Sequence, residues 1–287
     1  MQALTEQTQD HLTSFSKIVK AWRAVRKYSQ LALACDAGIS QRHLSFLESG
    51  RAKPSRDMVI NLSEALDIPL RDRNLMLGAA GFAPLYKQRA LNDEEMQPVY
   101  EALHRSITHH EPYPAIVIDG DWNLLLANDA THSLIELLGD SEKIWADVDP
   151  SGLKNIYRLT FHPKGLRSLI SNWNILAPQM LTRLQKEANE DPNNHALSIL
   201  LADVIVMSKE DEGYLKPHVN TPLMPILPME IALNGMRLNL FSMISTFGTA
   251  VDITASELKI ESFFPADAQT EQVFKAINGK ASSGAGF

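Results

Sequence analysis

Residues 29–50, SQLALACDAGISQRHLSFLESG, constrain the fold of this chain more than any other stretch. Ser29 and Ser40 each precede a short amphipathic run, where a serine hydroxyl can accept a hydrogen bond from a free backbone N–H of the first helical turn. Gly38 lies between the two runs, where a turn with positive φ costs least, and Gly50 follows the second run as a C-cap. The stretch therefore predicts a helix, a tight turn and a second helix.

The apolar spacing of the second helix indicates which of its side chains face outward. Leu44 and Leu47 recur at a helical spacing and are expected to point into a core. The polar residues at the N-terminal end of this helix then face solvent, as in a helix that reads base edges in the major groove of DNA. Gln and Arg can form paired hydrogen bonds with adenine and guanine, and an outward Phe can contact a thymine methyl group.

A helical hairpin in some other all-α domain is the alternative interpretation. The serine caps, the glycine turn, the inward leucines and the flanking basic residues all agree, and together they favour DNA binding. We predict double-stranded DNA as a partner, with base contacts from the second helix and phosphate contacts from the flanking residues. The predicted DNA-binding residues are Gln30, Ser40, Gln41, Arg42, Ser45, Phe46, Arg51 and Lys53.

Two further observations agree with a DNA-binding head on a larger body. The chain has 287 residues, enough for two domains, and its net charge of −7 is unevenly divided. Residues 1–80 carry a net charge of +3 and the remainder −10. A mildly basic head attached to an acidic body fits a protein that touches DNA through one end only.

The single cysteine and the apolar runs bear on the compartment. Cys35 cannot form a disulfide framework or a cysteine-based metal site, which fits a reducing environment, and we interpret it as a small buried apolar residue. No basic and apolar leader is recognisable at the N-terminus. The longest apolar run, residues 197–207, contains Asp203 and is too short to cross a bilayer. We expect a cytoplasmic protein without membrane contact.

Helical patterns extend on both sides of the central pair of helices. Residues 14–27 form an apolar helical face, and residues 55–66 and 69–79 follow with helical spacing of their own. We therefore predict a compact five-helix, all-α domain over residues 1–84.

The rest of the chain predicts an α+β domain over residues 85–278, followed by a flexible tail over residues 279–287. We expect five antiparallel strands with helices on one face. The predicted strands are residues 115–119, 122–127, 223–233, 237–247 and 257–264, with a hairpin turn at AsnGly 234–235. The predicted helices are residues 94–110, 129–138 and 164–207, the last broken around 177–178 and 191–194.

Much of the chain resembles a known family. Residues 14–84 are similar to an Xre/Cro-type, lambda repressor-like helix-turn-helix domain of the kind found in MmyB-like transcription regulators. The resemblance continues through AIVIDGDWNLLLAN at 115–128, LTFHPKGLRSLISNW at 159–173 and LNLFSMISTFGTAVDITASELKIESFFPAD at 238–267. It implies a PAS-like domain that binds a ligand or dimerises, and it implies a fatty-acid-like ligand.

Catalytic motifs are not recognisable in the second domain. It contains no HExxH pair, no glycine-rich phosphate loop and no GxSxG elbow. His104, His109 and His110 lie close together, and we interpret them as a solvated helix end rather than as a metal site. We therefore predict no catalytic residue, no metal and no cofactor other than a bound fatty acid or similar apolar molecule.

An apolar pocket is the more plausible site in this domain. Phenylalanine and methionine fill irregular apolar cavities, although each such residue can equally be part of the core. Arg167 interrupts an apolar stretch and could hold a carboxylate or form a salt bridge within the protein. The predicted ligand-binding residues are Phe161, His162, Arg167, Trp173, Phe241, Met243 and Phe247.

Together these observations predict a transcription regulator that binds DNA as a homodimer and responds to a small apolar ligand. A dimer is expected because one helix-turn-helix reads few base pairs. Two alternatives stay open at this point. In the first, the PAS-like domain serves only for dimerisation or protein interaction, and in the second it is an enzyme.

Overall fold

The computed structural model describes residues 15–208, 226, 228–233 and 235–284. The chain divides into two compact units. The N-terminal unit runs to Arg89 and includes the short segments 189–193 and 249–256, whereas the C-terminal unit contains the remainder. The division between the units along the chain thus falls at residues 89/90, against the predicted boundary at 84/85.

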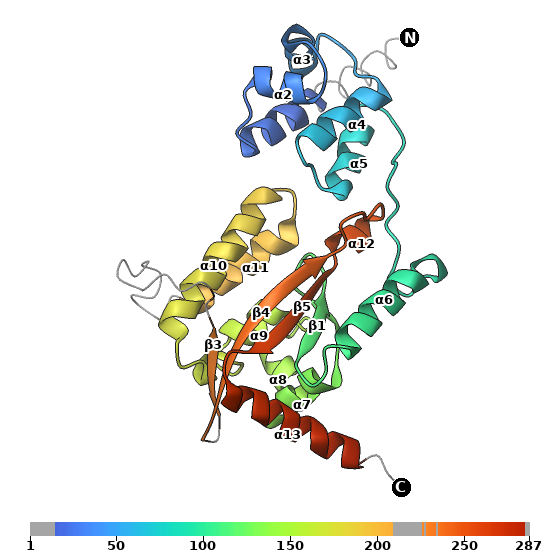
Figure 1. Cartoon of the computed structure of the whole chain (residues 1–287). Coiled ribbons are helices and arrows are strands. Elements are labelled where there is room, and N and C mark those ends of the chain that lie inside the picture. The colour runs from blue at the N-terminus through green and yellow to red at the C-terminus, as the bar shows by residue number, and fades with distance from the viewer. Residues whose placement is uncertain (1–14, 209–225, 227, 234, 285–287) are drawn as a thin grey trace. The chain divides into compact units, whose positions relative to one another are not determined.

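The N-terminal unit is all-α, as predicted, with five helices between residues 15 and 79. They span residues 15–25, α2 (Gln30–Asp36), α3 (Gln41–Glu48), α4 (Arg56–Ala65) and α5 (Leu70–Ala79) (Figure 1).

The serine caps predicted from the sequence are confirmed. Ser29 Oγ accepts a hydrogen bond from the Ala32 amide at 3.1 Å, and Ser40 Oγ accepts one from the His43 amide at 3.1 Å. Gly38 has a φ of +66°, which an L side chain rarely adopts. The positive φ of Gly38 and the Ser40 cap thus set where α2 ends and where α3 begins.

One apolar core holds the helices of this unit together. Leu33, Leu44 and Leu47 have no exposed surface, and Trp22 is 2% exposed. Cys35 is exposed, so its interpretation as a buried apolar residue was wrong. The physical reason is that successive helix residues are rotated by about 100°, which turns position 35 away from the face that buries Leu33 and Ala34.

A buried carboxylate links the first helix to the end of α3. Glu48 is 1% exposed and accepts hydrogen bonds from Arg23 Nε at 2.6 Å and Nη2 at 3.1 Å. Gln30 Nε2 donates a third, at 2.7 Å. Because burying a charge is costly unless it is paired and hydrogen-bonded, this arrangement depends on all three side chains.

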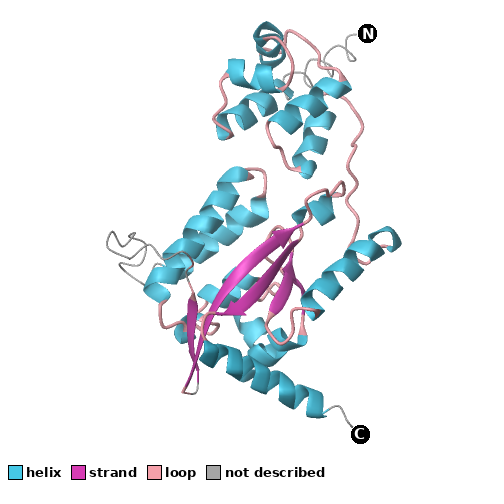
Figure 2. Ribbon diagram, in the orientation of Figure 1, coloured by secondary structure: helices cyan, strands magenta, loops and turns pink. Residues whose placement is uncertain are grey.

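The C-terminal unit is built on one antiparallel sheet of five strands in the order β2-β1-β5-β4-β3 (Figure 2). The chain enters the sheet through two neighbouring strands and returns to it, after a block of helices, through the other three. The strands are β1 (Ala115–Ile118), β2 (Leu124–Ala127), β3 (Met229–Leu233), β4 (Met236–Thr246) and β5 (Lys259–Pro265).

All five strands lie within predicted strands or shift from them by a residue at one end. The first part of the predicted strand 223–233 lies outside the described residues, as does Asn234 of the predicted hairpin turn, whereas Gly235 has a φ of +79°.

Helices lie on both faces of this sheet, so the prediction that they cover only one face was wrong. Ile116 and Ile118 on one face pack against side chains of α9 (Ile156–Phe161), α10 (Trp173–Glu190) and α11 (His195–Ser208). Ala115 and Val117 on the other face pack against Leu103 of α6 (Gln97–Thr108). The sequence of β1 carried a signal for this, because its four residues, AIVI, form a continuous apolar run, as in a strand that is buried on both faces.

Two helical predictions also need correction. Pro178 lies inside α10 rather than breaking it. The predicted flexible tail from residue 279 begins within α13 (Ala268–Gly284).

Four helices, α8, α9, α12 and α13, had not been predicted from the sequence. Along the chain after α5, the helical elements are η1 (Glu94–Met96), α6 (Gln97–Thr108), α7 (Asp129–Leu138), α8 (Ser141–Val148), α9 (Ile156–Phe161), η2 (Arg167–Leu169), α10 (Trp173–Glu190), α11 (His195–Ser208), α12 (Ile253–Glu257) and α13 (Ala268–Gly284). Of these, α12 lies almost wholly in the segment 249–256 that is grouped with the N-terminal unit. In the described ranges, no helix combines the length and the apolar character that crossing a membrane requires.

The buried carboxylate of Glu48 gives a stability prediction. Replacing it in Glu48→Gln leaves Arg23 without its ionic partner, and we expect a loss of about 3 kcal/mol in the free energy of unfolding of the N-terminal unit. Glu64→Gln is the matched control, because Glu64 is 59% exposed and lies 3.8 Å from Arg73. It should cost under about 1 kcal/mol. Urea unfolding of both variants measures the difference, and equal losses would contradict the role given to Glu48.

Candidate functional site

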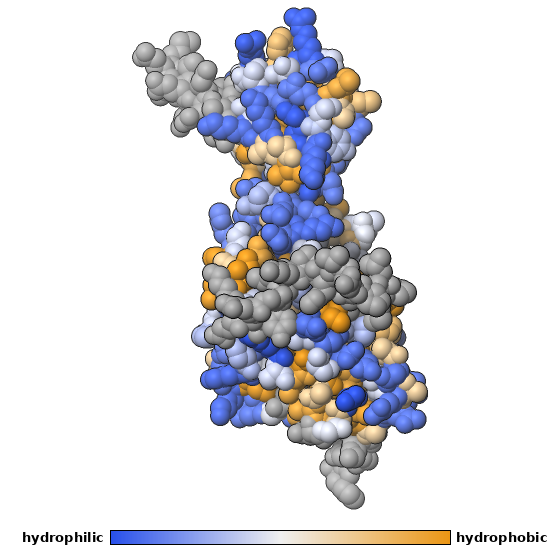
Figure 3. All heavy atoms as spheres, turned by 90° about the vertical axis from the view of Figure 1, so that its left-hand side faces the viewer, coloured by the Kyte–Doolittle hydropathy of each residue, from blue (hydrophilic) through white to orange (hydrophobic). Residues whose placement is uncertain are grey.

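The outer face of α3 carries the side chains that the sequence predicted to contact DNA. Ser40, Gln41 and Arg42 are exposed, and Ser45 and Phe46 are half-buried. Leu44 and Leu47 on the opposite side of the helix are fully buried, which fixes its rotation about its own axis. The face of the N-terminal unit drawn in Figure 3 is mostly hydrophilic.

Two of these side chains are held against each other. The Arg42 guanidinium carbon lies 5.4 Å from the centroid of the Phe46 ring, within the range of a cation–π contact. This contact pre-orients Arg42 along the exposed face of α3. A guanidinium held in that way retains free N–H groups for the paired acceptors of a guanine edge.

The three predicted phosphate contacts lie beside α3. Arg51 and Lys53 are exposed in the loop after the helix, and the Arg51 amide donates to the Phe46 carbonyl at 2.9 Å. Gln30 is half-buried at the start of α2, where its side-chain amide donates to Glu48. All eight predicted residues thus come from α2, α3 and the segments that flank α3.

A cavity of about 270 Å³ lies in the C-terminal unit, between the sheet and α7, α9 and α10. Most of its lining is aliphatic or aromatic, which suits an apolar ligand. The lining residues come from every strand: Ile116 from β1, Leu124 from β2, Met229 and Ile231 from β3, Leu240, Phe241 and Ser242 from β4, and Glu261 and Phe263 from β5. The facing elements contribute Thr131, Leu134, Ile135, Ile156, Leu159, Thr160, Leu176, Gln179, Met180 and Arg183, and Pro114, Trp122 and Leu166 complete the lining.

Trp122 is placed at this cavity by the turn between β1 and β2. Its φ of +68° is unusual for a bulky residue. Asp119 holds the turn, because one of its carboxylate oxygens accepts hydrogen bonds from the amides of Asp121 at 2.9 Å and Asn123 at 2.8 Å. The indole N–H donates to Glu187 Oε2 at 2.8 Å.

Two cations lie over the Trp122 ring. The Arg183 guanidinium carbon is 4.3 Å from the ring centroid and Lys259 Nζ is 4.6 Å from it. Both cations are also bonded to Glu187, at 3.2 Å and 2.8 Å respectively. Burial alone would raise the pKa of Glu187, but attraction to Lys259 and its hydrogen bonds lower that pKa below the ordinary value.

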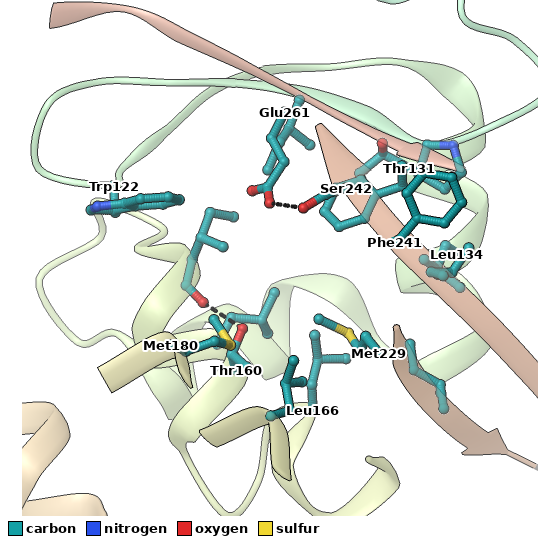
Figure 4. A pocket seen from close by; sticks show the side chains of 18 of the residues that line it. Trp122, Thr131, Leu134, Thr160, Leu166, Met180, Met229, Phe241, Ser242 and Glu261 are labelled. Carbon is teal, nitrogen blue, oxygen red and sulfur yellow. Dashed lines mark hydrogen bonds between the residues drawn. The ribbon is translucent and has the colours of Figure 1, made fainter. Parts of the chain in front are cut away.

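Glu261 is the acidic residue of the lining and has a different environment. It is 7% exposed, and its Oε1 accepts a hydrogen bond from Ser242 Oγ at 2.6 Å (Figure 4). Burial raises the pKa of the Glu261 carboxyl, while the Ser242 hydrogen bond and the charges of Arg183 and Lys259 oppose that rise. Two glutamates of one region are thus shifted in opposite directions.

Of the seven residues predicted to bind ligand, Phe241 lines this cavity and the other six lie elsewhere. Phe161 and Trp173 are buried in the neighbouring core. Met243 is 58% exposed, and Phe247 packs with the cluster on the opposite face of the sheet. Side chains alternate along β4, so Ser242 and Met243 cannot face the same side.

The two polar residues predicted at the pocket have structural partners. His162 caps the end of α9, and its Nδ1 accepts a hydrogen bond from the Lys164 amide at 3.2 Å. Arg167 donates to the Met207 carbonyl at 2.9 Å and lies over the Trp173 ring.

Sequence reasoning missed Trp122, Arg183, Ser242 and Glu261. A signal existed for Glu261, because it is an acidic residue among the apolar residues of the strand KIESFFP.

The three neighbouring histidines do not converge on a common point. His104 is exposed and stacks on Tyr100, His109 is exposed, and His110 hydrogen-bonds to the Phe263 carbonyl at 2.7 Å. Within the described part of the chain, no group of three or more His, Cys, Asp or Glu residues could hold a metal ion.

The opposite pKa shifts of the two glutamates predict opposite effects on stability. The lowered pKa of Glu187 means that it contributes stability above its ordinary pKa of 4.5, and this is lost as the pH falls through its folded pKa. Glu187→Gln should therefore cost about 1–3 kcal/mol near neutral pH and less in acid.

The raised pKa of Glu261 means that the unmodified chain loses stability as the pH rises from 4.5 through the folded pKa. Glu261→Gln should therefore stabilise the protein near neutral pH, by about 1.4 kcal/mol for each unit of the raised pKa, with the gain fading in acid. Urea unfolding as a function of pH measures both variants. A change of the same sign in both would contradict the environments described.

Comparisons with known proteins give a family match in each of the two units. Residues 99–277 match the family described as MmyB-like transcription regulator ligand binding domain, and residues 19–72 match the helix-turn-helix family. These are domains of transcription regulators rather than of enzymes. Among curated proteins, none matches the sequence. Because the first match covers more than half of the chain, this protein belongs to the family of MmyB-like transcription regulators.

Proposed function

We propose that this DNA-binding regulator reads a specific operator through α3 and that a small apolar ligand in its C-terminal unit controls DNA binding. The reading of an operator through α3 is supported by the contrast between the buried face and the exposed face of this helix. Leu44 and Leu47 are fully buried, whereas Gln41 and Arg42 are exposed at the N-terminal end of the helix. That end of a recognition helix lies closest to the base edges.

Within this proposal the eight residues have two kinds of role. Gln41, Arg42, Ser45 and Phe46 contact base edges from the exposed face of α3, and Ser40 lies at the end that approaches the DNA. Arg51, Lys53 and Gln30 hold the backbone phosphates on either side, which fixes the position of the helix in the groove.

The ligand part of the proposal is supported by the cavity. The cavity of about 270 Å³ is lined by mainly apolar side chains of the sheet and of α7, α9 and α10. This favours a ligand-binding domain over one that serves only for dimerisation or protein interaction, in which the domain's own side chains would fill the space. The apolar lining suits the chain of a fatty-acid-like molecule.

We also propose that the protein acts as a homodimer in the cytoplasm, where its DNA is. One helix-turn-helix contacts few base pairs, and specific operators usually contain two half-sites about one helical turn apart. The ligand would act by binding one arrangement of the two DNA-binding units more tightly than the other, because only such a difference can shift the equilibrium.

The base-reading role of Arg42 gives a prediction for DNA binding. Arg42→Ala should weaken binding to the selected operator by about 1–3 kcal/mol and relax specificity at one position. Lys53→Ala is the matched control, because Lys53 is also exposed and cationic but is assigned to a phosphate. It should weaken binding to all sequences alike and reduce the dependence on salt. Mobility-shift titrations on the operator and on single-base variants measure both, and an equal loss for Arg42→Ala on every duplex would count against base reading.

The cavity gives a prediction for ligand binding. Native mass spectrometry of the chain purified without added ligand should find a bound apolar molecule. Leu134→Trp should reduce the bound fraction, because Leu134 lines the cavity and the larger side chain fills it. Met243→Trp is the control, because Met243 is 58% exposed and outside the lining. If no bound molecule is found and no apolar probe stabilises the protein, the ligand part of the proposal fails. The alternative, a domain that serves only for dimerisation or protein interaction, would then remain.

A further inference from the structure

The Glu261 carboxyl is the acidic group in a cavity lining that is mainly apolar. It projects from β5 into the space between the sheet and the helices, opposite Thr160 and Met180 (Figure 4). Among the described residues its one hydrogen-bond partner is Ser242, whose hydroxyl donates to Oε1. A carboxyl group has more hydrogen-bonding capacity than this single contact uses, so Glu261 can bind a polar group of a ligand.

The charges around Glu261 disfavour a charged ligand group at this point. Arg183 and Lys259 both act on the Glu261 carboxyl and would repel a ligand cation. Glu187, which is bonded to both cations, acts on Glu261 with the opposite charge and, together with Glu261, would repel a ligand anion. Because such interactions are strong in an apolar surrounding, an uncharged polar group is the one that avoids both penalties.

A hydroxyl group fits Glu261 better than an ether or an ester does. It can donate to the carboxyl when Glu261 is ionised and accept from it when Glu261 is protonated. An ether or an ester can only accept, so it leaves the ionised carboxylate without a further partner. Thus the chemistry of Glu261 selects a ligand group that can donate.

The volume of the cavity sets the size of the ligand. A cavity of about 150 Å³ accommodates benzene, so one of about 270 Å³ accommodates about ten non-hydrogen atoms. The hydrophobic remainder of such a ligand would contact the aliphatic lining on the side of Leu166 and Met229 (Figure 4).

We propose that the cavity takes an uncharged apolar molecule of about ten non-hydrogen atoms whose hydroxyl group hydrogen-bonds to Glu261. This inference rests on the proposed function, because it specifies the ligand of the same cavity. It differs from the fatty-acid expectation in the polar end, which is a hydroxyl rather than an ionised carboxylate.

Four probes of similar size test this proposal by isothermal titration calorimetry on the whole chain. They are 1-nonanol, the ether 1-methoxyoctane, nonanoate and nonylamine. We expect 1-nonanol to bind about tenfold more tightly than 1-methoxyoctane, the effect of one hydrogen bond to a charged group. It should also bind more tightly than either charged probe.

Two variants assign this preference to Glu261. In Glu261→Met the preference for 1-nonanol over 1-methoxyoctane should disappear, while both probes still bind through apolar contacts. Ser245→Ala is the control, because Ser245 lies on β4, is exposed and is outside the lining, and it should keep the preference.

The results separate this inference from the proposed function. Equal binding of 1-nonanol and 1-methoxyoctane to the unmodified chain would overturn the role of Glu261 while leaving a ligand-binding domain. Tightest binding of nonanoate would do the same and would assign the polar end of the ligand to Arg183 instead. If none of the four probes binds, both the inference and the ligand part of the proposed function fail.

Discussion

The burial of Leu44 and Leu47 is the interaction on which the rest of this account depends. Both side chains are fully enclosed in the core of the N-terminal unit, so α3 cannot rotate about its axis without exposing them. Burying a leucine contributes about 1.5–3 kcal/mol, which makes any other rotation unfavourable. The exposed positions of Gln41 and Arg42 follow from this constraint, and the Glu48–Arg23 pair fixes the end of the same helix.

The C-terminal unit shows a different balance between stability and function. A buried carboxyl beside an apolar cavity is costly, and the raised pKa of Glu261 reflects that cost. Close by, Glu187 is satisfied by Lys259, Arg183 and the Trp122 indole, and its pKa is lowered. The region thus combines one compensated acid, which stabilises the fold, with one poorly compensated acid, which faces the cavity.

The sequence predicted those features that depend on local chemistry. The serine caps, the positive φ of Gly38 and the inward positions of α3 follow from residues a few positions apart. The five strands were also recognisable from alternation and turn residues. Helices on both sides of the sheet were not predicted, although the continuous apolar run AIVI of β1 is the pattern that indicates them.

The cavity could not be located in the same way. It forms where five strands and three helices meet, so its lining is set by tertiary packing rather than by spacing along the chain. Phe161 and Trp173 are aromatic residues close in sequence to residues of the cavity lining, but they are buried in the neighbouring core.

The most direct test of the central claim is a methylation-protection measurement on a selected operator bound by the whole chain. Dimethyl sulfate reacts with guanine N7 in the major groove, which is the groove that α3 is proposed to enter. The account predicts protection of guanine N7 in two half-sites about one helical turn apart. A stable complex that leaves every guanine N7 reactive, or that protects only the minor groove, would contradict it.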